Sequence, residues 1–258
     1  MRIATWNVNS LKVRLPRLEE WLNYANPDVL CLQETKLADS AFPAMDIERL
    51  GYEWVHHGDG RWNGVAILSK VGISDVITGF DDGIDDEPSE TRAITAKCGG
   101  IQVTSVYVPN GRSLDNEMYA WKLQWLERLR GFLDRTAKPS DDVIVCGDFN
   151  IAPEDRDVYD PKAFEGETHV SADERKRLQA ILDWGLVDVF RQQWPDESKL
   201  YTWWDYRQGM FHKGKGMRID LLLATDPLAK RATFALMDRN ARKGESPSDH
   251  APTFIDID

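Results

Sequence analysis

The feature that most constrains the fold is a series of short, almost wholly apolar segments, each bounded by polar residues. Such runs are typical of central strands that are covered on both faces. The predicted strands are residues 2–8, 29–33, 64–69, 101–108, 142–146, 218–224 and 251–257. Helical spacing of apolar residues predicts helices between some of them, at residues 14–24, 116–135 and 172–184. The order of elements predicts an α/β or α+β sandwich.

The length and composition agree with a soluble folded domain without disulfides. The 258 residues are 42% hydrophobic and 29% charged, so the chain can bury a large core in one domain spanning residues 1–258. The cysteines, Cys31, Cys98 and Cys146, lie far apart in apolar surroundings, which predicts buried free thiols in a reducing compartment. No secretory signal or membrane span is recognisable, so we expect a cytoplasmic protein that does not enter a membrane.

The net charge of −11 argues against a protein that binds nucleic acid through a uniformly basic surface. Part of that charge lies in an acidic run at residues 81–90, which we interpret as a solvated loop. Basic residues gather further along the chain, and a local basic face can exist on an acidic protein. This basic group comprises Arg207, His212, Lys213, Lys215 and Arg218. A second long loop is expected at residues 149–170, and loops of that length are often functional.

Polar side chains repeatedly mark the ends of the predicted strands. The strongest example is Asp148 and Asn150, two residues apart in the segment GDFN, where extended chain would point both side chains the same way. This segment alone fits a functional site and an ordinary Gly-Asp turn equally well. Four further clusters follow the same design, although each by itself is weak. They contain Asn7 with Asn9, Glu34, Asp220, and Asp249 with His250.

The residue types in these clusters suit metal-assisted hydrolysis. Carboxylate and amide oxygens are the ligands that Mg²⁺ prefers, whereas Zn²⁺ would require more histidine or cysteine. A phosphodiester is the natural substrate, because a metal and an amide can stabilise added charge on phosphoryl oxygens while an acid positions water. No serine or cysteine lies in a nucleophile-elbow pattern.

Six motifs together resemble the exonuclease III family of abasic-site endonucleases, in the endonuclease/exonuclease/phosphatase superfamily. The resemblance extends from residue 1 to about residue 253. The motifs are ATWNVNSLKVR (4–14), LQETK (32–36), NGVAILSK (63–70), GDFNIAP (147–153), RIDLLLA (218–224) and SDHAP (248–252). Glu34 and Asp148 occur across the superfamily, whereas RIDLLLA and SDHAP favour the abasic-site branch.

The resemblance implies a four-layer α/β sandwich, with two β-sheets face to face, helices outside, and the site at one end of the sheets. It implies that Glu34, supported by Asn7 and with Asp249 nearby, holds Mg²⁺, for which Mn²⁺ could substitute. Asp148 would activate water, and Asn150 would hydrogen-bond the scissile phosphate. Tyr107 would contact the phosphate or stabilise the leaving oxygen. His250, oriented by Asp220, would bind the phosphate. Alternation over residues 105–108 leaves open a core position for Tyr107.

The resemblance also implies a substrate, namely double-stranded DNA with an abasic site or a blocked 3′ end, cut by a monomer. The pocket for a sugar without its base would be formed by Trp203, Met217 and Ile219. The DNA backbone would contact Asn110, Arg112, Arg207 and Lys213. The expected activity is hydrolysis 5′ to the abasic site, with 3′–5′ exonuclease and 3′-phosphatase activity. Two alternatives stay open: a superfamily phosphodiesterase acting on RNA or phospholipid head groups, and a non-catalytic module that binds abasic DNA.

Overall fold

The computed structural model describes residues 1–84 and 91–258, and there two six-stranded sheets pack face to face. One sheet has the order β11-β12-β1-β2-β4-β3, and the other has the order β5-β6-β7-β8-β10-β9. The first contains β1 (Arg2–Asn7), β2 (Val29–Gln33), β3 (Glu53–His57), β4 (Val65–Ser69), β11 (Ala232–Met237) and β12 (Thr253–Ile257). The second contains β5 (Ser74–Thr78), β6 (Ala93–Cys98), β7 (Ile101–Tyr107), β8 (Val143–Asp148), β9 (Leu186–Asp188) and β10 (Asp220–Thr225).

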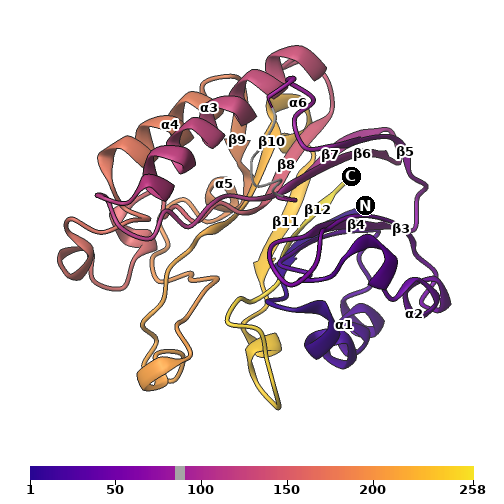
Figure 1. The fold of residues 1–258 in the computed structure, drawn as a ribbon, viewed down its shortest axis with the longest axis horizontal. Helices are drawn as coiled ribbons and strands as arrows, with labels where there is room; N and C mark the ends of the chain where they lie inside the picture. The colour runs from indigo at the N-terminus through magenta and orange to yellow at the C-terminus, as the bar shows by residue number, and fades with distance from the viewer. Residues whose placement is uncertain (85–90) are drawn as a thin grey trace.

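Helices cover the outer faces of both sheets (Figure 1). On the first sheet lie α1 (Leu11–Ala25) and α2 (Ala44–Arg49), while α3 (Glu117–Thr136) and α4 (Ala172–Leu182) lie on the second. The short helices α5 (Val189–Gln193) and α6 (Asp226–Ala229) pack beside β9 to β11. The four-layer α/β sandwich predicted from the sequence is therefore confirmed.

Alternation along the central strands explains why they are apolar throughout. In β2, Val29 and Cys31 face the other sheet, whereas Leu30 and Leu32 face α1. Side chains of successive residues in a strand point to opposite faces, so a strand buried on both sides is mostly apolar on both faces. The core between the sheets also contains all three cysteines, which are free and buried as predicted.

Several elements differ from the predictions made from sequence. The strands β3, β5, β6, β9 and β11 were not among the predicted runs. The first helix begins at Leu11 rather than at residue 14, and it accommodates Pro16 in its second turn. The loop at residues 149–170 contains two short 3₁₀ helices, Asp155–Asp157 and Pro161–Phe164. Of the acidic run, residues 85–90 lie outside the described residues, and Asp82 is not merely solvated, because it pairs with Arg128 at 2.7 Å.

Candidate active site

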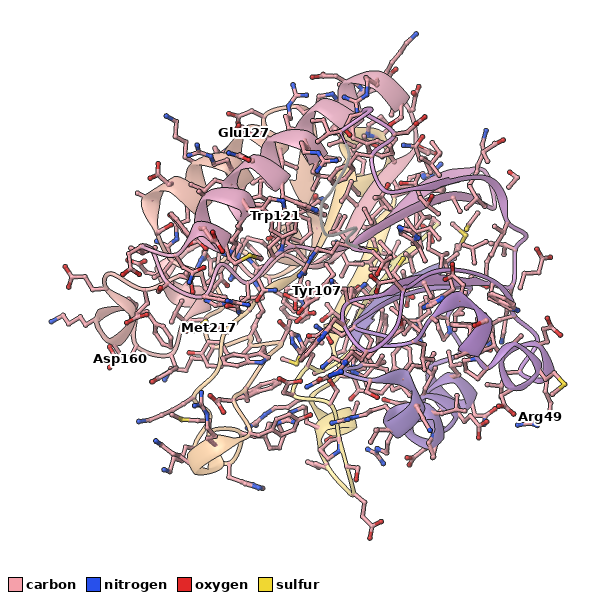
Figure 2. The ribbon with its side chains drawn as sticks, viewed as in Figure 1. Arg49, Tyr107, Trp121, Glu127, Asp160 and Met217 are labelled. Atoms are coloured by element: carbon pink, nitrogen blue, oxygen red, sulfur yellow. The ribbon has the colours of Figure 1, made fainter. Side chains whose placement is uncertain are left out.

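A pocket of about 530 Å³ opens where strands from both sheets end. Twelve of the fifteen residues predicted for the site line it: Glu34, Tyr107, Asn110, Arg112, Asp148, Asn150, Trp203, Arg207, Met217, Ile219, Asp249 and His250. In Figure 2, Tyr107 lies near the middle of the molecule between the strand layers, with Met217 to its side and Glu127 on the outer face of α3. Tyr107 therefore belongs to the pocket, and the alternative of a position wholly within the core is wrong.

The two sheets contribute equal shares of the polar cluster. Asn7 ends β1 and Glu34 follows β2, its parallel neighbour, so these two side chains leave the first sheet side by side. Asp148 ends β8 of the second sheet, between Tyr107 on β7 and Asp220 on β10. The convergence follows from topology, because residues at the same level of adjacent strands must lie near one another.

Gly147 lets β8 deliver Asp148 into this position. Its φ is +145°, and a Cβ at this residue would lie only 2.0 Å from the carbonyl oxygen of Val106 on β7. No real Cβ fits there, so only glycine permits this approach of the two backbones. Asn150, two residues beyond the end of β8, has a φ of 50°, and Glu34, which directly follows β2, has a φ of 51°. Left-handed backbone at non-glycine residues is uncommon and gathers at functional sites.

Buried polar side chains join the sheets directly beneath the cluster. Gln33 on β2 donates from Nε2 to Oγ of Ser105 on β7 at 3.0 Å, and it also donates to Thr5 on β1 at 3.0 Å. Ser105 in turn donates to the carbonyl oxygen of Leu32 at 3.2 Å. All four residues are buried. Hydrogen bonds satisfied within a dry interior fix one arrangement of the groups that make them, here the register of one sheet against the other.

Asn7 organises the two carboxylates that face the pocket. Its Nδ2 donates to Oε1 of Glu34 and to Oδ2 of Asp148, both at 2.9 Å, while its Oδ1 accepts from the backbone N–H of Asn9 at 3.0 Å. Among the described residues, ligand atoms of Glu34, Asp148 and His250 lie within 4.8 Å of one another. Two carboxylates on one side of this group give oxygen donors that suit a hard divalent cation.

Asp249 lies beside this group and accepts hydrogen bonds from Asn9 and Trp203. Its Oδ1 accepts from Asn9 Nδ2, and its Oδ2 accepts from the indole N–H of Trp203, each at 3.0 Å. Burial opposes ionisation of Asp249, but the neighbouring His250 and these two donors outweigh it and lower the pKa of the carboxyl. Asp249 thereby keeps a negative charge near the cluster and fixes the indole of Trp203.

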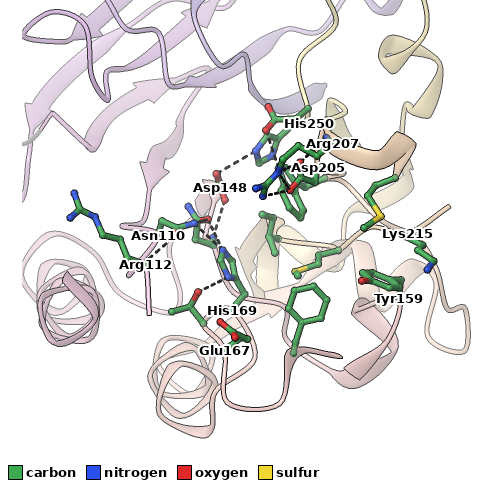
Figure 3. Close-up of a pocket in the computed structure, with 18 of the residues that line it drawn as sticks. Asn110, Arg112, Asp148, Tyr159, Glu167, His169, Asp205, Arg207, Lys215 and His250 are labelled. Atoms are coloured by element: carbon green, nitrogen blue, oxygen red, sulfur yellow. Dashed lines mark hydrogen bonds and ion pairs between the residues drawn. The ribbon is translucent and has the colours of Figure 1, made fainter. Parts of the chain in front are cut away.

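His250 and Asp220 form a buried ion pair behind Asp148. His250 Nδ1 lies 2.8 Å from Asp220 Oδ2, and its Nε2 faces Asp148 Oδ2 at 3.7 Å (Figure 3). Burial disfavours the charged imidazole, but the carboxylates of Asp220 and Asp148 outweigh it and raise the pKa of His250 to about 10. His250 is therefore an imidazolium at neutral pH, with one N–H directed away from Asp220 and towards the pocket.

The pKa of Asp148 is also raised, which for a carboxyl group disfavours the charged form. Burial raises its pKa to about 7, and the charges of Asp220 and Glu34 act in the same direction, although His250 opposes them. A carboxylate with a pKa near neutrality can accept a proton from water more readily than an ordinary aspartate. Its Oδ1 is fixed by the backbone N–H of Asn150 at 2.9 Å, which leaves Oδ2 to face the pocket.

Two asparagines and a histidine form the next part of the pocket wall. Asn150 donates from Nδ2 to the carbonyl of Val108 at 2.9 Å, and its Oδ1 lies 3.3 Å from Asn110 Nδ2. His169 Nε2 lies 3.1 Å from both Asn150 Oδ1 and Asn110 Nδ2. One N–H of the Asn150 amide has no partner in these contacts and can face a ligand in the pocket.

The opposite wall is apolar. Trp203 pairs with Met217 through backbone hydrogen bonds of 2.9 and 3.0 Å, and Met217 and Ile219 are buried against Phe164 and Val170. This places the three residues predicted to form the sugar pocket side by side. Phe164 and Tyr159, both from the loop at residues 149–170, complete this wall, so the loop does contribute to the pocket.

Comparison with known proteins identifies the architecture. A sequence profile of the Endonuclease/Exonuclease/phosphatase family matches residues 4–250. The chain belongs to this family. Exodeoxyribonuclease III of Haemophilus influenzae is 33% identical over the full length of both chains. Two solved structures each have a TM-score of 0.96 and cover 100% of this chain and 99% of the other. They are an AP endonuclease from Archaeoglobus fulgidus, at 42% identity, and a 3′ phosphatase, NExo, from Neisseria bound to product DNA hairpin, at 40%.

Three residues predicted for the site do not line the pocket of this family member. Asn7 and Asp220 are buried behind it, where Asn7 contacts Glu34 and Asp148 and Asp220 contacts His250. Lys213 is exposed outside the pocket, where Lys215 takes the lining position instead. The interpretation of Arg218 as part of a basic face is wrong. Its guanidinium is 1% exposed and is held by Asp157 and Asp188 at 2.7 Å each, so it offers no charge to a ligand.

Sequence reasoning missed His169, although the residue touches two predicted site residues. It lies in the long loop at residues 149–170, where no periodic pattern distinguishes one polar residue from another. Its φ of 76° and its contacts with Asn110 and Asn150 become visible only in three dimensions. Among the described residues, no helix is both long enough and apolar enough to cross a membrane.

We expect His169 to make the folded state sensitive to mild acid. Burial, followed by the charge of Lys122, lowers the pKa of His169 from 6.5 to about 4. The unfolded chain therefore takes up a proton from about pH 6.5 downward while the folded protein does not, so this contribution to stability is complete above that pH and declines towards pH 4. Denaturant unfolding at pH 7.5 and 4.5 should show a smaller acid-induced loss for His169→Gln than for the wild type. An equal loss in both proteins would contradict the assignment.

Proposed function

We propose that this protein is a Mg²⁺-dependent DNA repair nuclease that hydrolyses the phosphodiester on the 5′ side of an abasic site in duplex DNA. The observation that carries the proposal is the meeting of two features in one pocket. The polar cluster of Glu34, Asp148 and His250 lies at one side, and the apolar wall of Trp203, Met217 and Ile219 lies at the other. An apolar recess beside a phosphate site suits a deoxyribose without its base, because an intact base would not fit.

The residues divide the work of hydrolysis. Asp148 would take a proton from water and direct the oxygen at phosphorus, since its Oδ2 faces the pocket and its pKa is about 7. His250, Asn150 and Tyr107 would donate to the phosphoryl or leaving oxygens as charge develops. Asp220 would hold the His250 ring, and Asn7 would hold Glu34 and Asp148.

The donor set fits the metal that the family uses. Glu34 would hold Mg²⁺ through oxygen, with Asp249 nearby and Mn²⁺ as a possible substitute, since both ions favour carboxylate ligands. Bound there, the cation would neutralise charge on the phosphoryl oxygens. The ring nitrogens of His250 face carboxylates, with Nδ1 2.8 Å from Asp220 and Nε2 3.7 Å from Asp148.

DNA would lie across the pocket rim. Arg112 is exposed at one edge, and the exposed Arg207, paired with Asp205 at 2.6 Å, lies at the other (Figure 3). Asn110 and Lys213 are further candidates for backbone contact. We also propose that residues 1–258 act as a single catalytic domain and a monomer. A cytoplasmic location is supported by the free thiols in the core.

A second candidate activity is removal of a phosphate from a blocked 3′ end. It is favoured by the 40% identity and full coverage of the Neisseria 3′ phosphatase bound to a DNA hairpin. The same cluster could serve both reactions, because each attacks phosphorus with water and releases a sugar oxygen. The two differ in whether DNA continues beyond the phosphate.

One set of substrates tests these proposals together. Labelled duplexes carry a single abasic site, a nick with a 3′ phosphate, or no lesion, and each is incubated with Mg²⁺, Mn²⁺ or EDTA. We expect metal-dependent incision at the abasic site and none in the intact duplex interior. Phosphate release alone would favour the second candidate. Hydrolysis only of RNA or of a phospholipid head group would overturn both, and tight binding of abasic DNA without cutting would favour a non-catalytic module.

Replacement of Glu34 by Gln should raise the Mg²⁺ concentration needed for half-maximal incision by at least about tenfold, because the side chain loses its charge but keeps its shape. A metal titration of the incision rate measures this shift. Glu167→Gln is the matched control, since Glu167 is an acid at the outer rim of the same pocket and contacts none of the cluster. An unchanged titration in Glu34→Gln would remove Glu34 from the ligand set.

A further inference from the structure

Lys122 on α3 is a lysine without solvent contact, placed directly beneath the wall formed by Asn110 and Asn150. Its side chain is 0% exposed. Its three N–H groups meet three acceptors: the carbonyl of Asn150 at 2.7 Å, the carbonyl of Asn110 at 3.3 Å, and Oε1 of Glu174 at 2.5 Å. An ammonium has three donors and no acceptor, so this environment satisfies it completely.

Glu174 extends the same network to the far end of the loop at residues 149–170. Its Oε1 also accepts from the backbone N–H of His169 at 3.0 Å, and its Oε2 accepts from the N–H and hydroxyl of Ser171 at 3.0 and 2.7 Å. Ser171 is the N-cap of α4, so the carboxylate closes a capping box at this helix. The Lys122–Glu174 pair therefore binds the segments that carry Asn110, Asn150 and His169 to two helices.

Stability alone is a poor reason for such a pair. Burial lowers the pKa of Lys122, which shows that the interior opposes its charge, and Glu174 offsets that effect. Apolar residues of similar volume often replace a buried ion pair without loss of stability. The pair does something that apolar residues cannot do, which is to hold two backbone carbonyls at one point.

The positions of these carbonyls determine where the asparagine side chains point. Asn150 has left-handed backbone with a φ of 50°, and turning its carbonyl inward to Lys122 accompanies a side chain that turns outward to the pocket. Asn110 is followed by Gly111 with a φ of +88°, where an added Cβ would lie 3.2 Å from Cδ of Lys122. The two side chains meet at 3.3 Å on the pocket side of the same wall.

We propose that Lys122, held by Glu174, is a positioning residue that sets Asn150 and Asn110 for contact with the scissile phosphate. The inference rests on the proposed function and deepens it. A displacement of about 1 Å at a group that contacts the transition state can cost about 10²-fold in rate. Lys122 itself touches no substrate, because the backbone of both asparagines separates it from the pocket.

The main test is a double-mutant cycle with Lys122→Met and Asn150→Ala, measured as single-turnover incision of the abasic duplex. We expect Lys122→Met to lower kcat by about 10²-fold with KM changed less than about threefold. Because both changes act in part through the Asn150 amide, the rate loss of the double variant should be clearly smaller than the product of the two single losses. Lys122→Arg should restore part of the rate. Arg128→Met is the control, since it removes an ion pair with Asp82 from the same helix away from the pocket.

The outcomes separate this inference from the proposed function. A wild-type rate in Lys122→Met, or rate losses that multiply in the double variant, would overturn the inference while leaving the function intact. Failure of the wild type to cut any substrate would overturn the function. In that event side-chain amide NMR still decides the inference, since Lys122→Met should shift the NH₂ signals of Asn110 and Asn150 and leave those of Asn7 and Asn9 in place. Unshifted Asn110 and Asn150 signals would overturn it.

Discussion

Replacement of Asp148 by Asn is expected to lower kcat for incision by about 10³- to 10⁴-fold, the upper range for loss of a general base. The amide keeps the shape of the side chain, and its single oxygen can still accept either from the backbone N–H of Asn150 or from Asn7, which meet different oxygens of Asp148. It cannot take a proton from water. The loss should fall on kcat rather than on KM, because the proton is transferred only as the transition state forms.

The folded state of Asp148→Asn should be as stable as the wild type or more so. Burial raises the pKa of Asp148, with Asp220 and Glu34 adding to the effect, so the protein gains nothing in stability from this charge at neutral pH. Thermal unfolding of the purified variant provides the control for the kinetic measurement. A stable variant that cuts within tenfold of the wild-type rate would show that another group activates water.

The second large effect is expected for His250→Gln, with a fall in kcat of about 10²- to 10³-fold, as for removal of one preorganised donor. Glutamine can still donate to Asp220, but it carries no positive charge towards the pocket. His250 is an imidazolium at neutral pH because its pKa is about 10, so the variant removes a full charge from the site. Single-turnover rates at saturating metal isolate this loss from any change in cation affinity.

Stability must be followed in parallel for this residue, since Asp220 is buried and its Oδ2 is held by His250. Leaving a buried charge without a partner typically costs about 3 to 5 kcal/mol. The double variant His250→Gln with Asp220→Asn removes both charges and should unfold at a temperature closer to the wild type than the single variant. If the double variant recovers stability and also recovers the incision rate, His250 acts only on the fold.

The central strands were predictable from sequence because they are buried on both faces. Every position of β2 and β8 is buried, and this produces the apolar runs VLCL and VIVC before the polar residue that ends each strand. Four of the five missed strands, β3, β5, β9 and β11, lie at sheet edges, whereas β6 is buried at five of its six positions. β5 reads SDVIT and is mostly exposed, and β11 is exposed at three of its six positions. Their pairing is determined by the neighbouring strand rather than by their own sequence, which is why no local pattern reveals them.

The residues of the candidate site also fall into those that could be predicted from the sequence and those that could not. Asp148, Glu34, Asn7 and His250 were found because polar residues at the ends of apolar strands are conspicuous, and strand topology then brings them together. Lys122 was not found, because a single lysine in an amphipathic helix is indistinguishable in sequence from its solvated neighbours. Arg218 was misassigned for the same reason, since its partners Asp157 and Asp188 are distant in the chain.

The division of the polar cluster between the two sheets has a consequence for how the activity is lost. Asn7 ends a strand of one sheet, and Glu34 and His250 lie just outside strands of that sheet. Tyr107, Asp148 and Asp220 belong to the other sheet, and Gln33 and Ser105 join the two beneath them. Neither half alone contains a water-activating group and its charged partners. Fraying of the edge strands leaves the halves aligned, whereas separation of the sheets dismantles every contact at once. The active site is therefore lost when the two sheets separate in unfolding, and the incision rate that remains in denaturant is proportional to the fraction of molecules that are still folded.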